Sequence, residues 1–354
     1  MKNKSGCNSE VTICIPTYNS GKTIGETLSS LLTQTFKDFE IIVVDNCSTD
    51  NTVEIVKSFD DRRISVICNE QNIGAEANFE KCFYLSHGKY TAIFHADDVY
   101  HPEIVESEVR FLEQNLTAGA VFTRSTLIDE SGKSLGLDSM PPSFCDSEGW
   151  SRTYTFKEIF KSILRDLNFL VCPSAMVRTN IYKDHVKRWN GELFGTSADL
   201  GVWLRILEKY PIGILPEPLI HYRISSSQGG AIYRYLNTGR ADFFKVIDYY
   251  LTQDNVAASL TKRDREHLLF LENTDNYSRA MKCIITGNQQ LAKELTKNAW
   301  KPKLLKMALI TKPNRLMNRS RSRIWSYGII LYIVARAPFQ KRLKELVKRI
   351  RYKN

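Results

Sequence analysis

Two adjacent carboxylates, Asp97 and Asp98, end a strand that the apolar pattern predicts over residues 89–98. Carboxylate oxygens are the hard ligands that Mg²⁺ and Mn²⁺ prefer, and in enzymes such a cation commonly shares its coordination with the phosphates of a substrate. The pair therefore predicts a metal site for a phosphorylated ligand. The same two residues could instead form a polar turn that caps a helix starting near Pro102, and the local pattern leaves both interpretations open.

Polar residues also follow three earlier strand-like runs. Segments with helical spacing of apolar residues separate these runs, and the alternation predicts a parallel α/β sheet. Ligands of such sheets bind beyond the carboxyl ends of the strands, so these polar residues and the carboxylate pair are expected at one edge. Because the chain has no GxGxxG turn and no GxxxxGK[ST] loop, the metal would have to neutralise any phosphate there. The polar exits are residues 16–19, Asp45 and residues 69–74.

The composition indicates a globular cytoplasmic protein. Of the 354 residues, 43% are hydrophobic, which is enough for one large core or two moderate ones. The eight cysteines lack CxxC spacing and several lie in apolar runs, which favours a reducing compartment and no zinc site. The first ten residues contain no apolar stretch for a signal peptide, so we expect the catalytic part to stay in the cytoplasm.

The charge is distributed unevenly along the chain. Residues 301–354 carry sixteen Lys or Arg and one acid, whereas residues 1–300 have a net charge of −5. An apolar run of twelve residues, 324–335, lies within the basic segment and is shorter than the roughly 20 residues that span a bilayer. We expect a basic amphipathic segment that binds an anionic membrane surface. A helix packed on the domain with a solvated basic face is the alternative, and nucleic acid is not expected because no recognition motif accompanies the charge.

Three segments resemble the successive motifs of the family 2 glycosyltransferases, in the same order. They are VTICIPTYNSGKTIGETLSSLLTQTFKDFEIIVVDNCSTDNT, NIGAEANFEKCFYLSHGKYTAIFHADD and ADLGVWLRILEKYPIGILPEPLIHYRIS. The resemblance covers roughly residues 10–225 and implies the α/β GT-A fold, a Rossmann-like, mostly parallel sheet flanked by helices. With the helical signals beyond about residue 230, it predicts a glycosyltransferase domain at 1–228, a helical extension at 229–300 and a basic membrane-associating tail at 301–354.

The resemblance also implies an activity. A family 2 enzyme of the hexosyltransferase type moves a sugar from a nucleotide-sugar donor, expected here to be a UDP-sugar, to a saccharide or lipid-linked glycan acceptor with inversion. The implied cofactor is Mg²⁺ or Mn²⁺, and the implied role is bacterial surface polysaccharide biosynthesis at the inner face of the cell membrane. A metal-dependent nucleotide-sugar hydrolase and a non-catalytic glycan-binding or scaffold protein remain alternatives.

Matching motif positions imply the donor site. Pro16, Tyr18 and Asp45 match the positions that hold the base, although Tyr18 could instead be a core aromatic and Asp45 a turn cap. The third motif and the metal motif contribute further donor-binding positions, namely Asn72, Gly74, Asn78, Ala96 and Asp97. The implied metal ligands are Asp97 and Asp98.

Asp199, in ADLGVWLR, matches the position of the general base, and its alternative role is an N-cap for the helix that follows. The sequence departs from the family's motifs at four positions. His95 replaces the first motif Asp, where it could act as a nitrogen ligand or only fill space. The other departures are Ala77 for an arginine, Ala198 for an acid and Ser225 for a histidine.

Overall fold

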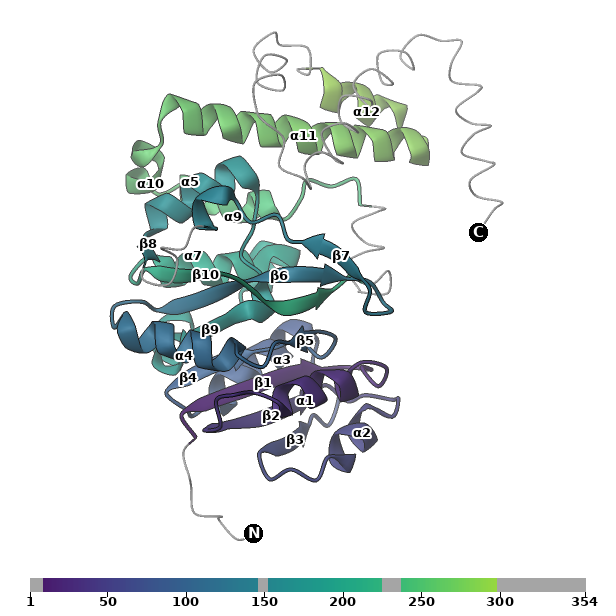
Figure 1. Cartoon of the computed structure of the whole chain (residues 1–354). Coiled ribbons are helices and arrows are strands. Elements are labelled where there is room, and N and C mark those ends of the chain that lie inside the picture. The colour runs from purple at the N-terminus through teal and green to yellow at the C-terminus, as the bar shows by residue number, and fades with distance from the viewer. Residues whose placement is uncertain (1–8, 146–151, 225–236, 298–354) are drawn as a thin grey trace. The chain divides into compact units, whose positions relative to one another are not determined.

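The computed structural model describes residues 9–145, 152–224 and 237–297, and Figure 1 draws their helices and strands. The first four strands alternate with three helices, as the apolar periodicity predicts, and they pair in parallel in the order β3-β2-β1-β4. Consecutive residues of Val11–Ile15 are all buried, so both faces of the sheet are covered, which explains the unbroken apolar runs. These elements are β1 (Val11–Thr17), α1 (Ile24–Leu32), β2 (Phe39–Asp45), α2 (Thr52–Ser58), β3 (Ile64–Cys68), α3 (Ala75–Leu85) and β4 (Tyr90–Ile93).

The same sheet continues through later strands and becomes mixed. β9 runs antiparallel between β4 and β6, whereas β6 and β10 are parallel, so the full order is β3-β2-β1-β4-β9-β6-β10-β5. The mostly parallel α/β sheet flanked by helices is therefore confirmed, with antiparallel strands in its second half. These elements are β5 (Val99–Tyr100), α4 (Ile104–Gln114), β6 (Ala120–Ile128), β7 (Ser134–Leu137), β8 (Thr153–Tyr154), α5 (Phe156–Asp166), β9 (Ala175–Arg178), α6 (Gly191–Phe194), α7 (Ala198–Leu207) and β10 (Ile212–Arg223).

The fourth strand is shorter than the sequence pattern predicts. The apolar run suggested a strand over residues 89–98, but β4 ends at Ile93. The amide of Phe94 still bonds to the Cys14 carbonyl, and the amide of His95 donates instead to the Tyr100 hydroxyl. The chain therefore turns at His95, and the two carboxylates lie in a short loop between β4 and β5.

Helices make up the described part of the second compact unit, residues 237–244 and 252–297. α11 begins with a capping box between Thr261 and Asp264 and ends before Gly287, whose φ of +90° suits glycine. Ala280, Cys283 and Ala292 bury the contact between α11 and α12. The helical C-terminal region is confirmed, and its elements are α10 (Asp254–Ser259), α11 (Lys262–Thr286) and α12 (Gln289–Thr296). α9 (Phe243–Leu251) precedes them, and its residues Lys245–Leu251 belong to the first unit.

The predicted basic tail, residues 301–354, lies outside the described residues. Within the described ranges, no helix is both long and apolar enough to cross a membrane. The functional division of the chain at residues 228 and 300 stays a prediction.

Candidate active site

The loop between β4 and β5 is held in place by aromatic and strand contacts. The Tyr100 hydroxyl accepts the His95 amide at 2.7 Å, and the Tyr100 ring stacks on Phe94 with 4.0 Å between centroids. Val99–Tyr100 forms β5 by pairing with β10. The backbone that presents the carboxylates is therefore anchored at both ends.

Asp98 is the inner of the two carboxylates. Its side chain is fully buried, and its Oδ1 accepts the backbone amide of Arg223 at 2.7 Å. Its Oδ2 has no hydrogen-bond partner in the described part of the chain. Burial and then the charge of Asp97 raise the pKa of Asp98 well above its usual value. The capping alternative is wrong for Asp98, because α4 begins at Ile104 and its N-cap is Glu103.

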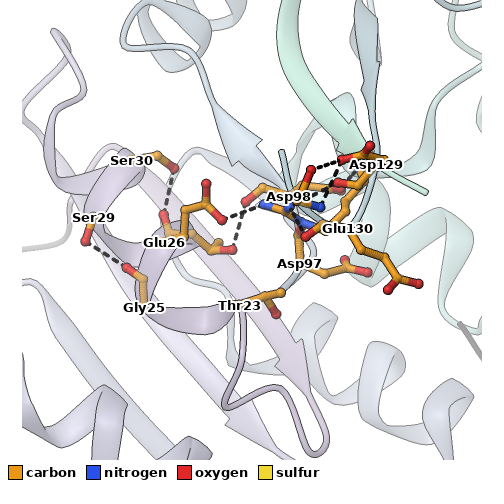
Figure 2. A network of polar contacts seen from close by, with 12 residues as sticks. Thr23, Gly25, Glu26, Ser29, Ser30, Asp97, Asp98, Asp129 and Glu130 are labelled. Atoms are coloured by element: carbon orange, nitrogen blue, oxygen red, sulfur yellow. Dashed lines mark hydrogen bonds and ion pairs between the residues drawn. The ribbon is translucent and has the colours of Figure 1, made fainter. Parts of the chain in front are cut away.

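Arg223, at the end of β10, holds the carboxylate loop through hydrogen bonds to Asp97 and Asp98. Its Nε donates to the backbone carbonyl of Asp97 at 2.8 Å, and its Nη2 pairs with Glu26 at 2.5 Å. Its Nη1 donates to the carbonyls of Asp129 and Glu130 at 3.3 and 3.2 Å. Figure 2 shows Glu26, Asp97, Asp98, Asp129 and Glu130 grouped around this network. With 4% of its surface exposed, Arg223 positions the loop instead of facing a ligand.

Three side chains of the loop form a group that could hold a cation. Ligand atoms of His95, Asp97 and Asp98 lie within 4.8 Å of one another. His95 Nε2 and Asp98 Oδ2 are both buried, and neither has a hydrogen-bond partner among the described residues. Buried polar atoms normally find partners, so these two atoms fit a bound divalent ion.

The β1 and β2 exits form the predicted base site. Pro16 lies within β1 beside Val44, and Tyr18 is 48% exposed, so the core-aromatic alternative for Tyr18 is wrong. Asp45 is buried and accepts hydrogen bonds from the Ser48 amide and hydroxyl at 2.9 and 2.5 Å. The turn-capping role of Asp45 is therefore present in the structure, and a contact with a base stays a prediction.

Sequence reasoning missed the link between these two exits. Asn19 accepts the Thr49 amide at 2.8 Å, and the Asn19 amide donates to the Ser48 hydroxyl at 2.8 Å. Asn19 has a φ of +50°, in the left-handed region that asparagine tolerates better than most residues. The PTYN ending contained this signal, because asparagine after a strand favours such turns.

The third motif forms a network of asparagine side chains at the β2 and β3 exits. Asn78, which is 2% exposed, donates to the Val44 carbonyl and accepts from Asn69, at 2.8 and 2.9 Å. Asn46 donates to Asn72 at 2.9 Å and accepts from Asn69 at 3.0 Å. Asn78 thus holds α3 to the strand ends, and its contact with a donor stays a prediction.

Three further residues belong to the donor positions predicted from the motifs. Asn72 is exposed and accepts the Gly74 amide at 2.9 Å. Gly74 has a φ of +84° and directly precedes α3, a conformation that glycine adopts without strain. Ala96 is buried in the carboxylate loop. Ser225, at a motif departure, lies outside the described residues.

Asp199 lies in the first turn of α7. It is the second residue of the helix and not the residue before it, so the N-cap alternative is wrong. Burial raises the pKa of its carboxyl group to about 6, although the Leu200 amide and Asn168 act in the opposite direction. The side-chain amide nitrogen of Asn168 lies 3.5 Å from Asp199 Oδ2. Asn168 directly follows Leu167, whose φ of +66° is strained for leucine. A carboxylate of this pKa can accept a proton near neutral pH.

The pKa of the Cys172 thiol is affected by both acidic parts of the site. Burial, and then the charges of Asp199 and Asp98, raise the pKa of its thiol well above the usual value. The thiol is therefore within electrostatic reach of both carboxylates, in the 3₁₀ turn Cys172–Ser174. No sequence signal distinguished Cys172 from the cysteines that pack in the core.

The pKa of Asp199 predicts a pH dependence. Below about pH 6 the carboxyl group is protonated and cannot accept a proton, so kcat/KM should fall about tenfold per pH unit there and level off above it. Asn168→Ala removes a donor that lowers this pKa, so the acid limb should move to higher pH. Rates from pH 5 to 8 with saturating metal test this, and an acid limb that Asn168→Ala leaves in place would contradict it.

The fold is that of the GT-A glycosyltransferases. The sequence model of Glycosyl transferase family 2 matches residues 12–186, and the chain belongs to this family. The chain is 35% identical, over 219 residues, to an uncharacterized glycosyltransferase of Methanocaldococcus jannaschii, with 60% of this chain and 70% of the relative covered. The chain is therefore a glycosyltransferase, as the sequence motifs predict.

A further relative has a defined reaction in its name. The Escherichia coli UDP-Glc:alpha-D-GlcNAc-diphosphoundecaprenol beta-1,3-glucosyltransferase WfaP is 33% identical over 133 residues. The match covers 37% of this chain and 52% of WfaP.

Solved structures share the fold at low sequence identity. TarS 1-349 of S. aureus, in complex with UDP-GlcNAc, has a TM-score of 0.56 and 18% identity, with 82% of this chain and 91% of the TarS 1-349 chain covered. The mannosyltransferase PcManGT of Pyrobaculum calidifontis, with GDP-Man and Mn²⁺, has a TM-score of 0.53 and 15% identity, with 90% and 86% covered. These likenesses support the GT-A fold.

Proposed function

We propose that this glycosyltransferase moves a sugar from a UDP-sugar to a saccharide or lipid-linked glycan acceptor, with inversion, in bacterial surface polysaccharide biosynthesis. The observation that carries the proposal is the pairing of two different acidic groups. Asp199 has a carboxyl pKa of about 6, suited to a proton acceptor, and the loop with Asp97 and Asp98 is suited to a cation. The named substrates of WfaP and the UDP-GlcNAc bound to TarS support the donor and the lipid-linked acceptor.

In this proposal, Asp199 accepts the proton of the acceptor hydroxyl while the acceptor oxygen forms its bond to the sugar carbon. The bond between that carbon and the diphosphate breaks on the opposite face, which inverts the configuration. Burial keeps the Asp199 carboxylate poorly solvated, and that makes it a stronger base than an exposed aspartate. Asn168 orients the carboxylate from its side of the site.

Asp97 and Asp98 would hold a divalent cation, Mg²⁺ or Mn²⁺, and the Mn²⁺ in the PcManGT structure supports this cofactor. When bound, the cation supplies positive charge that stabilises the departing diphosphate. The base and ribose of the donor would lie along the strand exits. The residues proposed there are Pro16, Tyr18, Asp45, Asn72, Gly74, Asn78, Ala96 and Asp97.

Product analysis tests the proposal. The full chain is incubated with Mn²⁺ and a panel of UDP-sugars, with and without diphosphoundecaprenol-linked saccharides, and the products are separated by mass. Release of UDP that requires an acceptor, with a glycosylated product, is expected. Release of free sugar without acceptor would favour a hydrolase, and donor binding without turnover would favour a non-catalytic glycan-binding protein.

We further propose that the enzyme works in the cytoplasm as a peripheral protein on the inner face of the cell membrane, through its basic tail. Removing residues 301–354, with a net charge of +15, should release the protein from anionic liposomes. Salt should weaken binding of the intact chain, because screening limits electrostatic attraction to about 8 Å at physiological ionic strength. Sedimentation with phosphatidylglycerol liposomes measures both effects. Equal sedimentation of the full and shortened chains would contradict the proposal.

A further inference from the structure

His95 is held in a defined orientation next to the two carboxylates. Its backbone amide is fixed by the Tyr100 hydroxyl at 2.7 Å. Its ring meets the ring of Phe79 edge-on, with 5.7 Å between centroids and an interplanar angle of 85°. Phe79 in turn packs against Trp189, with 4.7 Å between centroids. The imidazole is therefore supported by aromatic neighbours and does not depend on a polar partner for its position.

The polar atoms of His95 and Asp98 have unused bonding capacity. His95 Nε2 is buried and, in the described ranges, has no hydrogen-bond partner. Asp98 is fully buried, and its Oδ1 is occupied by the Arg223 amide, whereas its Oδ2 lies 4.0 Å from His95 Nδ1 without a hydrogen bond. Buried donors and acceptors rarely stay unsatisfied. His95, Asp97 and Asp98 each offer a ligand atom within 4.8 Å of the others, so one cation could bind a nitrogen of His95 together with the carboxylates.

The kind of ligand affects which metal is preferred. Mg²⁺ favours oxygen ligands and gives up its waters reluctantly, whereas an imidazole nitrogen suits transition metals. We propose that His95 is a nitrogen ligand of the divalent cation and makes the site prefer Mn²⁺ to Mg²⁺. This inference rests on the proposed function, because it requires a cation at Asp97 and Asp98. The opposing interpretation is that His95 only fills space or pairs with Asp98.

Pulsed electron paramagnetic resonance of bound Mn²⁺ tests the nitrogen ligand directly. The full chain, without a histidine tag, is loaded with Mn²⁺ and UDP, and coupling of the metal to a ligand ¹⁴N is measured. Coupling is expected in the unsubstituted chain and in His101→Gln, which alters an exposed histidine outside the group. It should disappear in His95→Gln and His95→Asp while Mn²⁺ stays bound.

A second measurement addresses the preference between metals. Calorimetric dissociation constants for Mn²⁺ and Mg²⁺, each in the presence of UDP, are compared between the unsubstituted chain and His95→Asp. An all-oxygen ligand set should reduce the Mn²⁺ preference by about 10- to 100-fold, the usual size of a ligand-environment effect. The His101→Gln chain should keep the original ratio.

The outcomes separate this inference from the proposed function. Bound Mn²⁺ without ¹⁴N coupling, or an unchanged metal ratio in His95→Asp, would overturn the role of His95 and leave the Asp97 and Asp98 site standing. No Mn²⁺ binding at all, with or without UDP, would overturn both. Loss of coupling in His95→Gln with intact coupling in His101→Gln would establish the nitrogen ligand.

Discussion

Replacing Asp199 with asparagine is expected to lower the turnover of sugar transfer by about 10²- to 10⁴-fold, the usual contribution of a general base. The substitution keeps the size of the side chain but removes its ability to accept a proton. Its half-buried carboxyl group, with a pKa of about 6, is suited to that role. Donor binding should remain, because the base acts on the acceptor hydroxyl. Initial rates with a competent acceptor, together with calorimetry of UDP binding, measure both quantities.

Asp254 provides a matched control for this substitution. Like Asp199 it lies in the first turn of a helix, but it is exposed and belongs to α10. Asp254→Asn should retain full activity. If it lost activity, the loss in Asp199→Asn could reflect a general effect of removing a first-turn carboxylate. Full transfer activity in Asp199→Asn would leave this residue with a structural role only.

Replacing Asp97 with asparagine is expected to abolish metal-dependent donor binding. A neutral amide is a much weaker ligand for Mg²⁺ or Mn²⁺ than a carboxylate. The fold should persist, because Arg223 bonds to the backbone carbonyl of Asp97, which the substitution retains. Calorimetric titration with UDP, in Mn²⁺ and again in EDTA, separates the metal-dependent part of the affinity.

The control for Asp97 is Asp60→Asn, which removes an exposed carboxylate ahead of β3, away from the carboxyl ends of the strands. Its thermal unfolding and its UDP affinity in Mn²⁺ should match those of the unsubstituted chain. If Asp97→Asn binds UDP as tightly as the control does in Mn²⁺, Asp97 is not a metal ligand. A lowered unfolding temperature in Asp97→Asn alone would show that the residue also supports the loop.

Much of the fold follows from local patterns in the sequence. Unbroken aliphatic runs predict strands buried on both faces, and helical spacing predicts α1 and α3 between them. The position of Asp97 at a strand exit follows from the same pattern. The end of β4 did not, because Phe94 still belongs to the apolar run although the strand ends at Ile93, and Tyr100, which accepts the His95 amide, lies outside that run.

The candidate site also depends on partners that are far apart in the sequence. The bond between Asp98 and the Arg223 amide joins residues 125 positions apart, and Asn168 reaches Asp199 across 31 positions. Cys172 comes near both acids because its turn contacts β4, β6 and β10, which are far apart in the sequence. A local pattern carries no information on such distances, because it does not specify which strands become neighbours.

The sequence alone determined the order of the first four strands and the helices between them, the strand-exit carboxylates and the family, because each depends on residue types at short spacing. The tertiary structure decided which carboxylate is buried, which acid has its pKa raised and which nitrogen lacks a partner. Those properties depend on solvent exclusion and on hydrogen bonds across the sheet. At the carboxylate loop, they arise only when β10 packs beside β5 and β6 and brings Arg223 within hydrogen-bond distance of Asp97.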